Sequence, residues 1–222
     1  MKKVIYIIRG KKTESYDDFL NRIAGAMGRV IVDNPVKLKV VLTVEAPPIL
    51  SVIPFKKTKI ACVSVWWKKD VLPDELTLIE GFVGKYSVTE ALPVIYDKSW
   101  PDLMMTPGVC LLTLFNRKKG ITREVFLDRW HYSHTPLSLK IHPLWNYTRN
   151  VVEKELTANS EHFEGIVEEQ FRTDGDLLNP FRFFGNPGII IPRMLAVYRD
   201  TKSFIDYSGI ETYRTMEIVV KS

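Results

Sequence analysis

The amino-acid sequence predicts an α+β protein made of two similar βαββαβ units, residues 1–105 and residues 106–222. The first observation behind this prediction is that each half alternates strand-length apolar runs with stretches of helical periodicity. The second is that the tetrapeptide FLNR at 19–22 returns as FLDR at 126–129, an offset of 107 positions. The third is that both halves close with a tyrosine, three residues, a glutamate and an apolar run. The paired positions are Tyr86 with Glu90 and Tyr213 with Glu217.

The elements of the first half follow from its apolar pattern and its capping residues. A strand is expected at 4–12, and Ser15 is placed to cap the next helix, with Asp18 three residues later. That helix has one apolar face at helical spacing, formed by Tyr16, Phe19, Leu20, Ile23 and Met27. The remaining elements are strands at 36–44, 59–67 and 86–94, with a short helical segment near 74–80 before the last strand.

The second half repeats this order. A strand at 108–120 leads to Thr122, which can cap a helix that carries Glu124 in its first turn. A second helix is expected from Asn186 toward Arg199, bent or shortened at Pro192. The other predicted strands lie at 145–152, 163–171 and 213–220.

The order βαββαβ is the split-βαβ, ferredoxin-like unit, whose sheet carries helices on one face only. The open face needs a partner, and two copies in one chain supply it by packing their sheets face to face. We therefore predict tandem ferredoxin-like repeats. Tyr86 and Tyr213, like Glu90 and Glu217, should then occupy equivalent positions on the last strands of the two units.

Composition narrows the classes of partner. The chain has 222 residues and a formal net charge of +5, but its basic residues come in scattered pairs and not on one face, so we expect no nucleic-acid partner. Cys62 and Cys110 lie within apolar runs and are expected to be buried free thiols. The first apolar run stops at Arg9, too short for a signal peptide. No run approaches the ~20 apolar residues of a membrane span, so a cytoplasmic protein without a membrane partner is expected.

Residues 108–220 also carry a series of short motifs in a fixed order. These are Arg-Lys-x-Gly at 117–120, a helix with Phe126 and Trp130, a His-x-Pro at His134 and Pro136, a strand with Tyr147 and Asn150, FEGIVEEQF at 163–171, and SFIDYS at 203–208. In this order they resemble the EthD family of the dimeric α/β-barrel superfamily. FEGIVEEQF is similar to the family's Asp-Gly-x-x-Glu strand, with Glu164 and Glu168 in the two acidic positions.

The resemblance implies a barrel-like pair of sheets with a pocket between sheet and helices. EthD relatives occur in ether and terpenoid degradation and in fungal polyketide processing. The wider superfamily includes polyketide cyclases, quinol-forming monooxygenases and heme proteins, so membership alone does not select a chemistry.

The stretch RWHYSHTP at 129–136 is the leading candidate site. On a helix, Trp130 and His134 share the face that packs on the sheet, whereas His131 is more peripheral. Pro136 is expected to bend or end the helix just beyond His134. A histidine at such a break can reach a cavity and exchange protons near neutral pH. The alternative is a histidine that only bonds a nearby carbonyl or carboxylate.

A metal site at His131 and His134 would need a third ligand, for which His162, Glu164 or Glu168 are the candidates. The flanking aromatic residues disfavour it, and we expect no metal.

Glu164 and Glu168 share one face of a strand, where burial would raise the pKa of a carboxyl and suit acid or base catalysis. The alternative is a buried salt bridge to Arg129, Arg149 or Arg172. Tyr147 and Tyr213 could donate to a ligand oxygen, although strand tyrosines also serve packing.

These residues predict a protein that binds a small, largely apolar oxygenated molecule such as an aromatic, terpenoid or polyketide-like compound. As an enzyme it would be a cofactor-free lyase, isomerase or cyclase, with His134 and Glu168 as catalytic residues and Trp130, Tyr147, Tyr213 and His131 around the substrate. The alternatives are a ligand-sequestering accessory protein and a heme-binding protein. A homodimer of the two-repeat chain is also considered. Met27 stands where the first half would carry its counterpart of His134, so we expect that half to have lost the chemistry.

Overall fold

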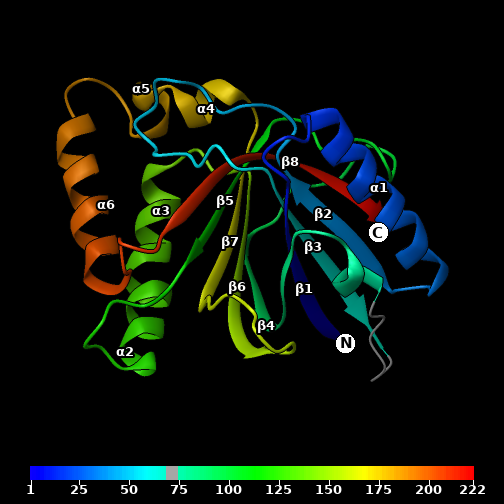
Figure 1. Ribbon diagram of the computed structural model, residues 1–222. Helices are drawn as coiled ribbons and strands as arrows, with labels where there is room; N and C mark the ends of the chain where they lie inside the picture. Colours follow the sequence, from blue (N-terminus) through cyan, green and yellow to red (C-terminus); the bar gives the residue numbers. More distant parts are fainter. Residues whose placement is uncertain (69–74) are drawn as a thin grey trace.

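The computed structural model describes residues 1–68 and 75–222, and within them eight strands close into an antiparallel barrel (Figure 1). Around the barrel the strand order is β1-β3-β2-β8-β5-β7-β6-β4. The strands are β1 (Lys2–Arg9), β2 (Lys37–Leu42), β3 (Ile60–Trp67), β4 (Phe82–Val94), β5 (Val109–Phe115), β6 (Asn146–Glu155), β7 (Gly165–Phe171) and β8 (Glu211–Lys221). The fold is α+β, as the sequence predicted.

Each half contributes four neighbouring strands in the same order, fourth-first-third-second. The two sets join where β2 pairs with β8 and where β4 pairs with β6. The register also agrees between the halves: Tyr86 lies opposite Ile5 on β1, and Tyr213 lies opposite Leu112 on β5. Ile5 and Leu112 differ by the same 107 positions that separate FLNR from FLDR.

Helices cover the outside of the barrel in two groups (Figure 1). The first half has α1 (Tyr16–Val32) and the short η1 (Glu75–Leu78), and the second half has α2 (Arg123–Asp128), η2 (Arg129–His134), α3 (Thr135–Ile141), α4 (Asp174–Leu178), α5 (Pro180–Phe183) and α6 (Ile190–Phe204). Apolar clusters fill the space between each helix group and its sheet, and a separate cluster fills part of the barrel interior. Because successive strand residues face opposite sides, one side chain of each pair enters the barrel and the other meets the helices.

Two helix starts are confirmed. The Ser15 hydroxyl accepts a hydrogen bond from the Asp18 N–H at the start of α1, and the Thr122 hydroxyl does the same for Val125 at the start of α2. Cys62 and Cys110 are buried free thiols, as expected. None of the helices in the described part of the chain is both long and apolar enough to cross a membrane.

The helix through RWHYSHTP does not end near His134. It widens into the π-helical turn η2, where the Thr135 N–H donates to the Trp130 carbonyl, and then continues as α3. The expectation that the helix stops just beyond His134 was wrong, because Pro136 lies in the first turn of α3, where a missing N–H is tolerated.

The second helix of this half was also displaced from its prediction. It spans Ile190–Phe204, whereas Asn186 forms a turn in which its side chain accepts from the Gly188 N–H. Pro192 falls in the first turn of α6, so it neither bends nor shortens the helix. In the first half the corresponding segment is only η1; residue 74, the start of the predicted segment, lies outside the described residues.

Candidate functional site

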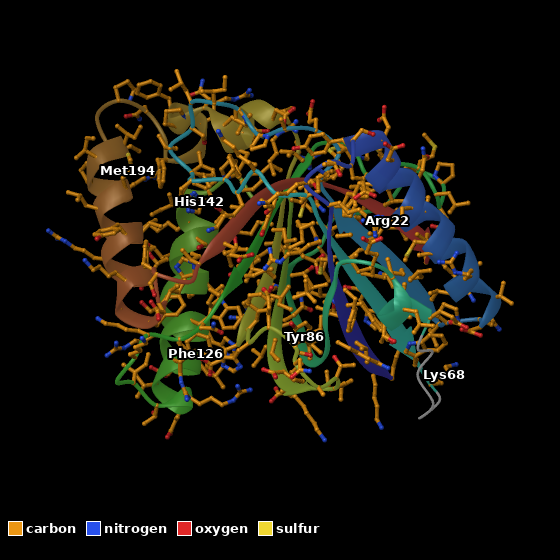
Figure 2. The ribbon with its side chains drawn as sticks, in the orientation of Figure 1. Arg22, Lys68, Tyr86, Phe126, His142 and Met194 are labelled. Atoms are coloured by element: carbon orange, nitrogen blue, oxygen red, sulfur yellow. The ribbon has the colours of Figure 1, made fainter. Side chains whose placement is uncertain are left out.

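A cavity of about 580 Å³ lies between the outer face of the second half's sheet and helices η2, α3 and α6. Met194 on α6 and His142, which follows α3, belong to its lining (Figure 2). Its walls are largely apolar, with Leu111, Phe115, Val167 and Val197 among them, and the loop around Ile53 adds a rim from the first half. Its polar side chains include His134, Ser138, His142, Tyr147, Glu169 and Tyr198. Apolar walls with a few polar groups are typical of a small-molecule site.

His134 is held by side chains on both of its ring nitrogens. Its Nδ1 lies 2.8 Å from Asp200 Oδ2 on α6, and its Nε2 lies 3.2 Å from the Ser138 hydroxyl one turn further along the helix. The ring also packs against Phe204, 5.4 Å between centroids. The π-helical turn and α6 therefore position this side chain together.

Asp200 determines which nitrogen of His134 is protonated. Burial acts to raise the pKa of Asp200, but hydrogen bonds from His134 and Ser133 outweigh it and lower that pKa, so the group is a carboxylate at neutral pH. A carboxylate only accepts hydrogen bonds, so Nδ1 carries the proton, and in the neutral imidazole Nε2 accepts from Ser138. An unprotonated Nε2 on the cavity wall is the position of a general base.

Trp130 and Tyr147 also line the cavity, as wall residues. Trp130 is buried and meets Phe115 edge to face at 5.0 Å. Tyr147 is buried on β6, where its hydroxyl bonds the side chains of Thr135 and Trp130, and burial raises its pKa. At neutral pH Tyr147 is a neutral phenol.

Glu169 is a carboxyl in the cavity that the sequence reasoning missed. It lies on β7 between Leu111 on β5 and Tyr147 on β6, half-buried, and it has no hydrogen bond or ion pair with any described residue. Burial raises the pKa of Glu169 to about 7. The signal was present in the sequence, since two adjacent glutamates on one strand must face opposite sides.

Glu168 faces the barrel interior and not the cavity, so the structure does not bring it to His134. Its side chain is fully buried, 2.5 Å from Lys39 Nζ and 3.8 Å from Lys3 Nζ, and it accepts from Asn150. Burial acts to raise the pKa of Glu168, but the two lysines and Asn150 lower it. Glu168 is thus an ionised member of a buried ionic cluster that joins the two halves. A buried salt bridge was the alternative expected for this carboxyl, but the expected partners Arg129, Arg149 and Arg172 were wrong, because the closed barrel brings lysines of the first half to it.

The other proposed substrate residues lie apart from the cavity. Tyr213 is buried in the barrel, where it accepts from Arg9 and donates to Glu211. His131 packs against Trp130 and is not among the cavity residues; burial lowers its pKa, and its Nε2 has no partner in the described part of the chain.

His142 and Asp200 were not anticipated from the sequence. His142 stacks on Phe183 at 4.0 Å and donates from Nδ1 to the Phe183 carbonyl, and burial lowers its pKa to about 4. It is a neutral imidazole in the cavity wall. Asp200 is 66 residues from His134, and no local sequence pattern predicts their contact.

The side chains around His134 do not form a metal site with several protein ligands. Within residues 1–68 and 75–222 no group of three or more His, Cys, Asp or Glu side chains could hold an ion. His134 would ligate iron or zinc through Nε2 only by exchanging its hydrogen bond with Ser138, and His162 is paired with Glu155.

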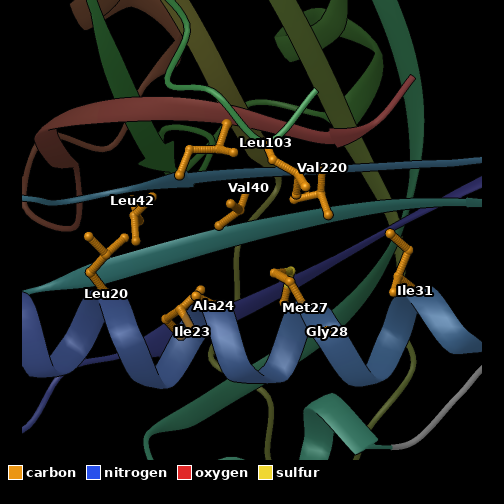
Figure 3. Close-up of a pocket in the computed structure, with 11 residues that line it drawn as sticks. Leu20, Ile23, Ala24, Met27, Gly28, Ile31, Val40, Leu42, Leu103 and Val220 are labelled. Carbon is orange, nitrogen blue, oxygen red and sulfur yellow. The ribbon is translucent and has the colours of Figure 1, made fainter. Parts of the chain in front are cut away.

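The first half has a smaller hollow between α1 and the sheet, about 300 Å³ (Figure 3). Ile23 and Met27 on α1 face Val40 and Val220 across it, and every side chain in its lining is apolar. This hollow offers no group that exchanges protons.

Comparison with known proteins identifies the fold. No protein-family model and no curated protein matches the chain. Among solved structures, an anthrone oxidase-like protein superposes with a TM-score of 0.59 at 12% identity, covering 99% of this chain and 91% of its own. A candidate monooxygenase from Fusobacterium nucleatum gives 0.55 at 12% identity, covering 99% and 92%. The likeness shows that the chain has the dimeric α/β-barrel type of fold.

Proposed function

We propose that the chain binds a small, largely apolar oxygenated molecule in the second-half cavity and transfers a proton on it through His134. The observation that carries this proposal is the Asp200–His134–Ser138 chain of hydrogen bonds at the wall of an otherwise apolar cavity. Asp200 holds the proton on Nδ1 and stabilises the imidazolium that forms when Nε2 takes a proton. No cofactor is required for such a step.

The substrate class follows from the walls. Aromatic and aliphatic side chains surround the cavity, and Trp130 and Phe115 offer faces and edges for an aromatic ring. Proton removal next to a carbonyl leads to a lyase, isomerase or cyclase outcome. We further propose an EthD-like protein of the cytoplasm that arose by tandem duplication, supported by the shared strand order and by the matching register of Tyr86 and Tyr213.

Oxygenation is the second candidate. Both similar structures are described as oxidising proteins, an anthrone oxidase-like protein and a candidate monooxygenase. The carbanion that His134 would form on an anthrone is electron-rich, and dioxygen could then act as co-substrate. Proton abstraction is the first step of both candidates.

A sequestering protein would bind the same molecule without turnover, and a heme protein would bind iron at a histidine.

Two measurements test the proposal. Native mass spectrometry of purified protein should show a co-purifying small molecule, and anthrone in deuterated buffer under nitrogen should exchange its methylene protons faster with protein than without. His134→Ala should abolish the acceleration while its circular dichroism spectrum remains that of the folded protein. Consumption of oxygen in air would favour oxygenation, and binding without exchange would favour sequestration. A Soret band in the purified protein would contradict the cofactor-free assignment. Size-exclusion chromatography with light scattering tests the proposed homodimer.

A further inference from the structure

The geometry points to Glu169 as a second catalytic residue, which gives a proton to the carbonyl oxygen of an enolisable aromatic ketone while His134 removes the carbon-bound proton. The inference rests on the proposed function above and names its substrate class. It replaces Glu168, which faces the barrel interior, as the carboxyl that works with His134.

The placement of Glu169 is the first support. Its strand neighbours on the same face are Leu111 and Tyr147, so the side chains directly beside its carboxyl are one apolar group and one phenol. Tyr147 already bonds Thr135 and Trp130. No described residue pairs with Glu169, although both imidazoles of the cavity, His134 and His142, have protein partners. A half-buried carboxyl without a cation is poorly stabilised as an anion.

The surroundings of Glu169 keep it protonated near neutral pH. The titratable groups that line the same cavity are Tyr147 on β6, His134 on η2, His142 after α3, Tyr198 and Tyr207 on and after α6, and Lys56 in the first-half loop. His142 is neutral because burial lowers its pKa to about 4, and Lys56 is exposed at the rim. Burial correspondingly raises the pKa of Glu169 to about 7, so a proton donor and a proton acceptor coexist in one site.

The two groups stand on opposite walls, which suits a flat ketone between them. Glu169 comes from the sheet and His134 from the helix layer. His134 Nε2 takes the proton from carbon, the C–H electron pair forms a carbon–carbon double bond, and the carbonyl electron pair moves to oxygen. In anthrone this shift passes through the conjugated ring that lies between the methylene carbon and the carbonyl. That oxygen takes the proton of Glu169. The products are an enol, a Glu169 carboxylate and a His134 imidazolium, and reprotonation at carbon or exchange with solvent restores both groups.

The same arrangement determines which ligands are accepted. A carbonyl oxygen receives a hydrogen bond from the protonated carboxyl, whereas a bare hydrocarbon leaves that polar group unpaired. A ligand carboxylate would bury a negative charge between largely apolar walls, with Lys56 exposed at the rim. We therefore expect neutral ketones to bind better than matched hydrocarbons or acids.

The test compares Glu169→Gln with Glu169→Leu, using anthrone for exchange and 9-fluorenone, which cannot enolise, for binding. The glutamine amide can donate to a carbonyl but cannot give up its proton in the reaction. Glu169→Gln should keep 9-fluorenone affinity within about 3-fold and lower the anthrone exchange rate by about 100-fold. Glu169→Leu should lower both. Glu124→Gln, on the exposed side of α2, is the matched control and should change neither.

A measurement on the unaltered protein makes the result independent of how the variants fold. Carboxyl-labelled glutamate should show one resonance, absent from Glu169→Gln, that titrates near pH 7 and shifts when 9-fluorenone is added. If the Glu169→Gln variant exchanges anthrone protons at the wild-type rate while His134→Ala does not exchange them, this inference is overturned and the proposed function stands. No exchange and no 9-fluorenone binding by the wild-type protein would overturn both.

Discussion

Two adjacent glutamates on β7 meet opposite environments. Glu168 enters the barrel and lies among Lys39, Lys3 and Asn150, so its pKa is lowered although it is fully buried. Glu169 enters the cavity, finds no cation in the described structure, and has its pKa raised to about 7. The side of the sheet that each glutamate faces therefore determines whether its pKa is lowered or raised.

The barrel interior and the cavity also differ in what surrounds the charge. One end of the interior holds an ionic cluster in which Lys39 bridges Glu168 and Glu217. Burial acts to lower the pKa of Lys39, but the two carboxylates raise it above its usual range. Every ion there has an opposite partner, as buried ions need. The cavity instead keeps its carboxyl unpaired, which is how proteins prepare a group for proton transfer.

The largest expected effect comes from removing Glu168. Glu168→Ala leaves Lys39 facing only Glu217 in the buried cluster and deprives Lys3 of one carboxylate, so we expect a loss of about 3–5 kcal/mol in the free energy of unfolding. Glu169→Ala removes an unpaired carboxyl and should change stability far less. Urea denaturation at pH 7.5 measures both. Equal losses would mean that the two glutamates do not differ as described.

The pH dependence of stability provides a second test with the same variant, Glu168→Ala. Because its pKa is lowered in the folded state, its contribution is present above the ordinary value of 4.5 and disappears as the pH falls through the folded pKa. The stability gap between wild type and Glu168→Ala should therefore narrow in acid.

The next effect contrasts the two outer faces of the barrel. Met27 is buried on α1 beside the apolar hollow of the first half, so Met27→Ala should reduce the free energy of unfolding by about 2–4 kcal/mol. Ligand affinity should stay nearly unchanged, because the polar groups belong to the second half. By contrast, His134→Ala should lose the chemistry and only about 1–2 kcal/mol of stability, because Asp200 loses one hydrogen bond but keeps that from Ser133. Equal loss of 9-fluorenone binding in both variants would contradict this division.

Much of the fold could be predicted from the sequence, because strands and helix caps are local features. Each of the eight predicted strand runs overlaps an observed strand, and Ser15 and Thr122 cap their helices. The candidate site was harder to predict from the sequence than the fold. The spacing of Glu164 and Glu168 indicates a common face but not which side of the sheet that face meets. That side depends on Lys39, which lies 129 residues away and contacts Glu168 only in the closed barrel.

The helices over the second half's sheet show the same limit of prediction from sequence, because their contacts join residues far apart in the chain. His134 could be selected from its aromatic neighbours and from the proline, but its partner Asp200 lies on a helix whose bounds were misplaced by several residues. The π-helical turn is set by packing between η2 and α6 and by the proline that follows, and apolar periodicity does not reveal it.

The third effect is the pH dependence that Glu169 introduces. With its pKa raised to about 7, the folded chain keeps a proton between about pH 4.5 and pH 7 that the unfolded chain has lost. The folded state therefore loses stability as the pH rises across this range. Relative to Glu169→Gln, wild type should lose about 1–3 kcal/mol between pH 5 and pH 8. Urea midpoints of both proteins at several pH values measure this, and parallel curves would place a cation near Glu169.

The smallest expected effect separates positioning from chemistry in the Asp200–His134–Ser138 chain. The Ser138 hydroxyl donates to His134 Nε2, the nitrogen that we assign as base, so this bond competes with the substrate for the same lone pair. Ser138→Ala should change stability by about 1 kcal/mol or less and leave anthrone exchange equal or a few-fold faster. Ser133→Ala, which removes a bond to Asp200 on the side away from the base, is the matched control. A roughly 100-fold loss of exchange in Ser138→Ala alone would show that the serine itself carries the proton. The assignment of His134 as the direct base would then be wrong, and the cavity would work through a relay of three residues.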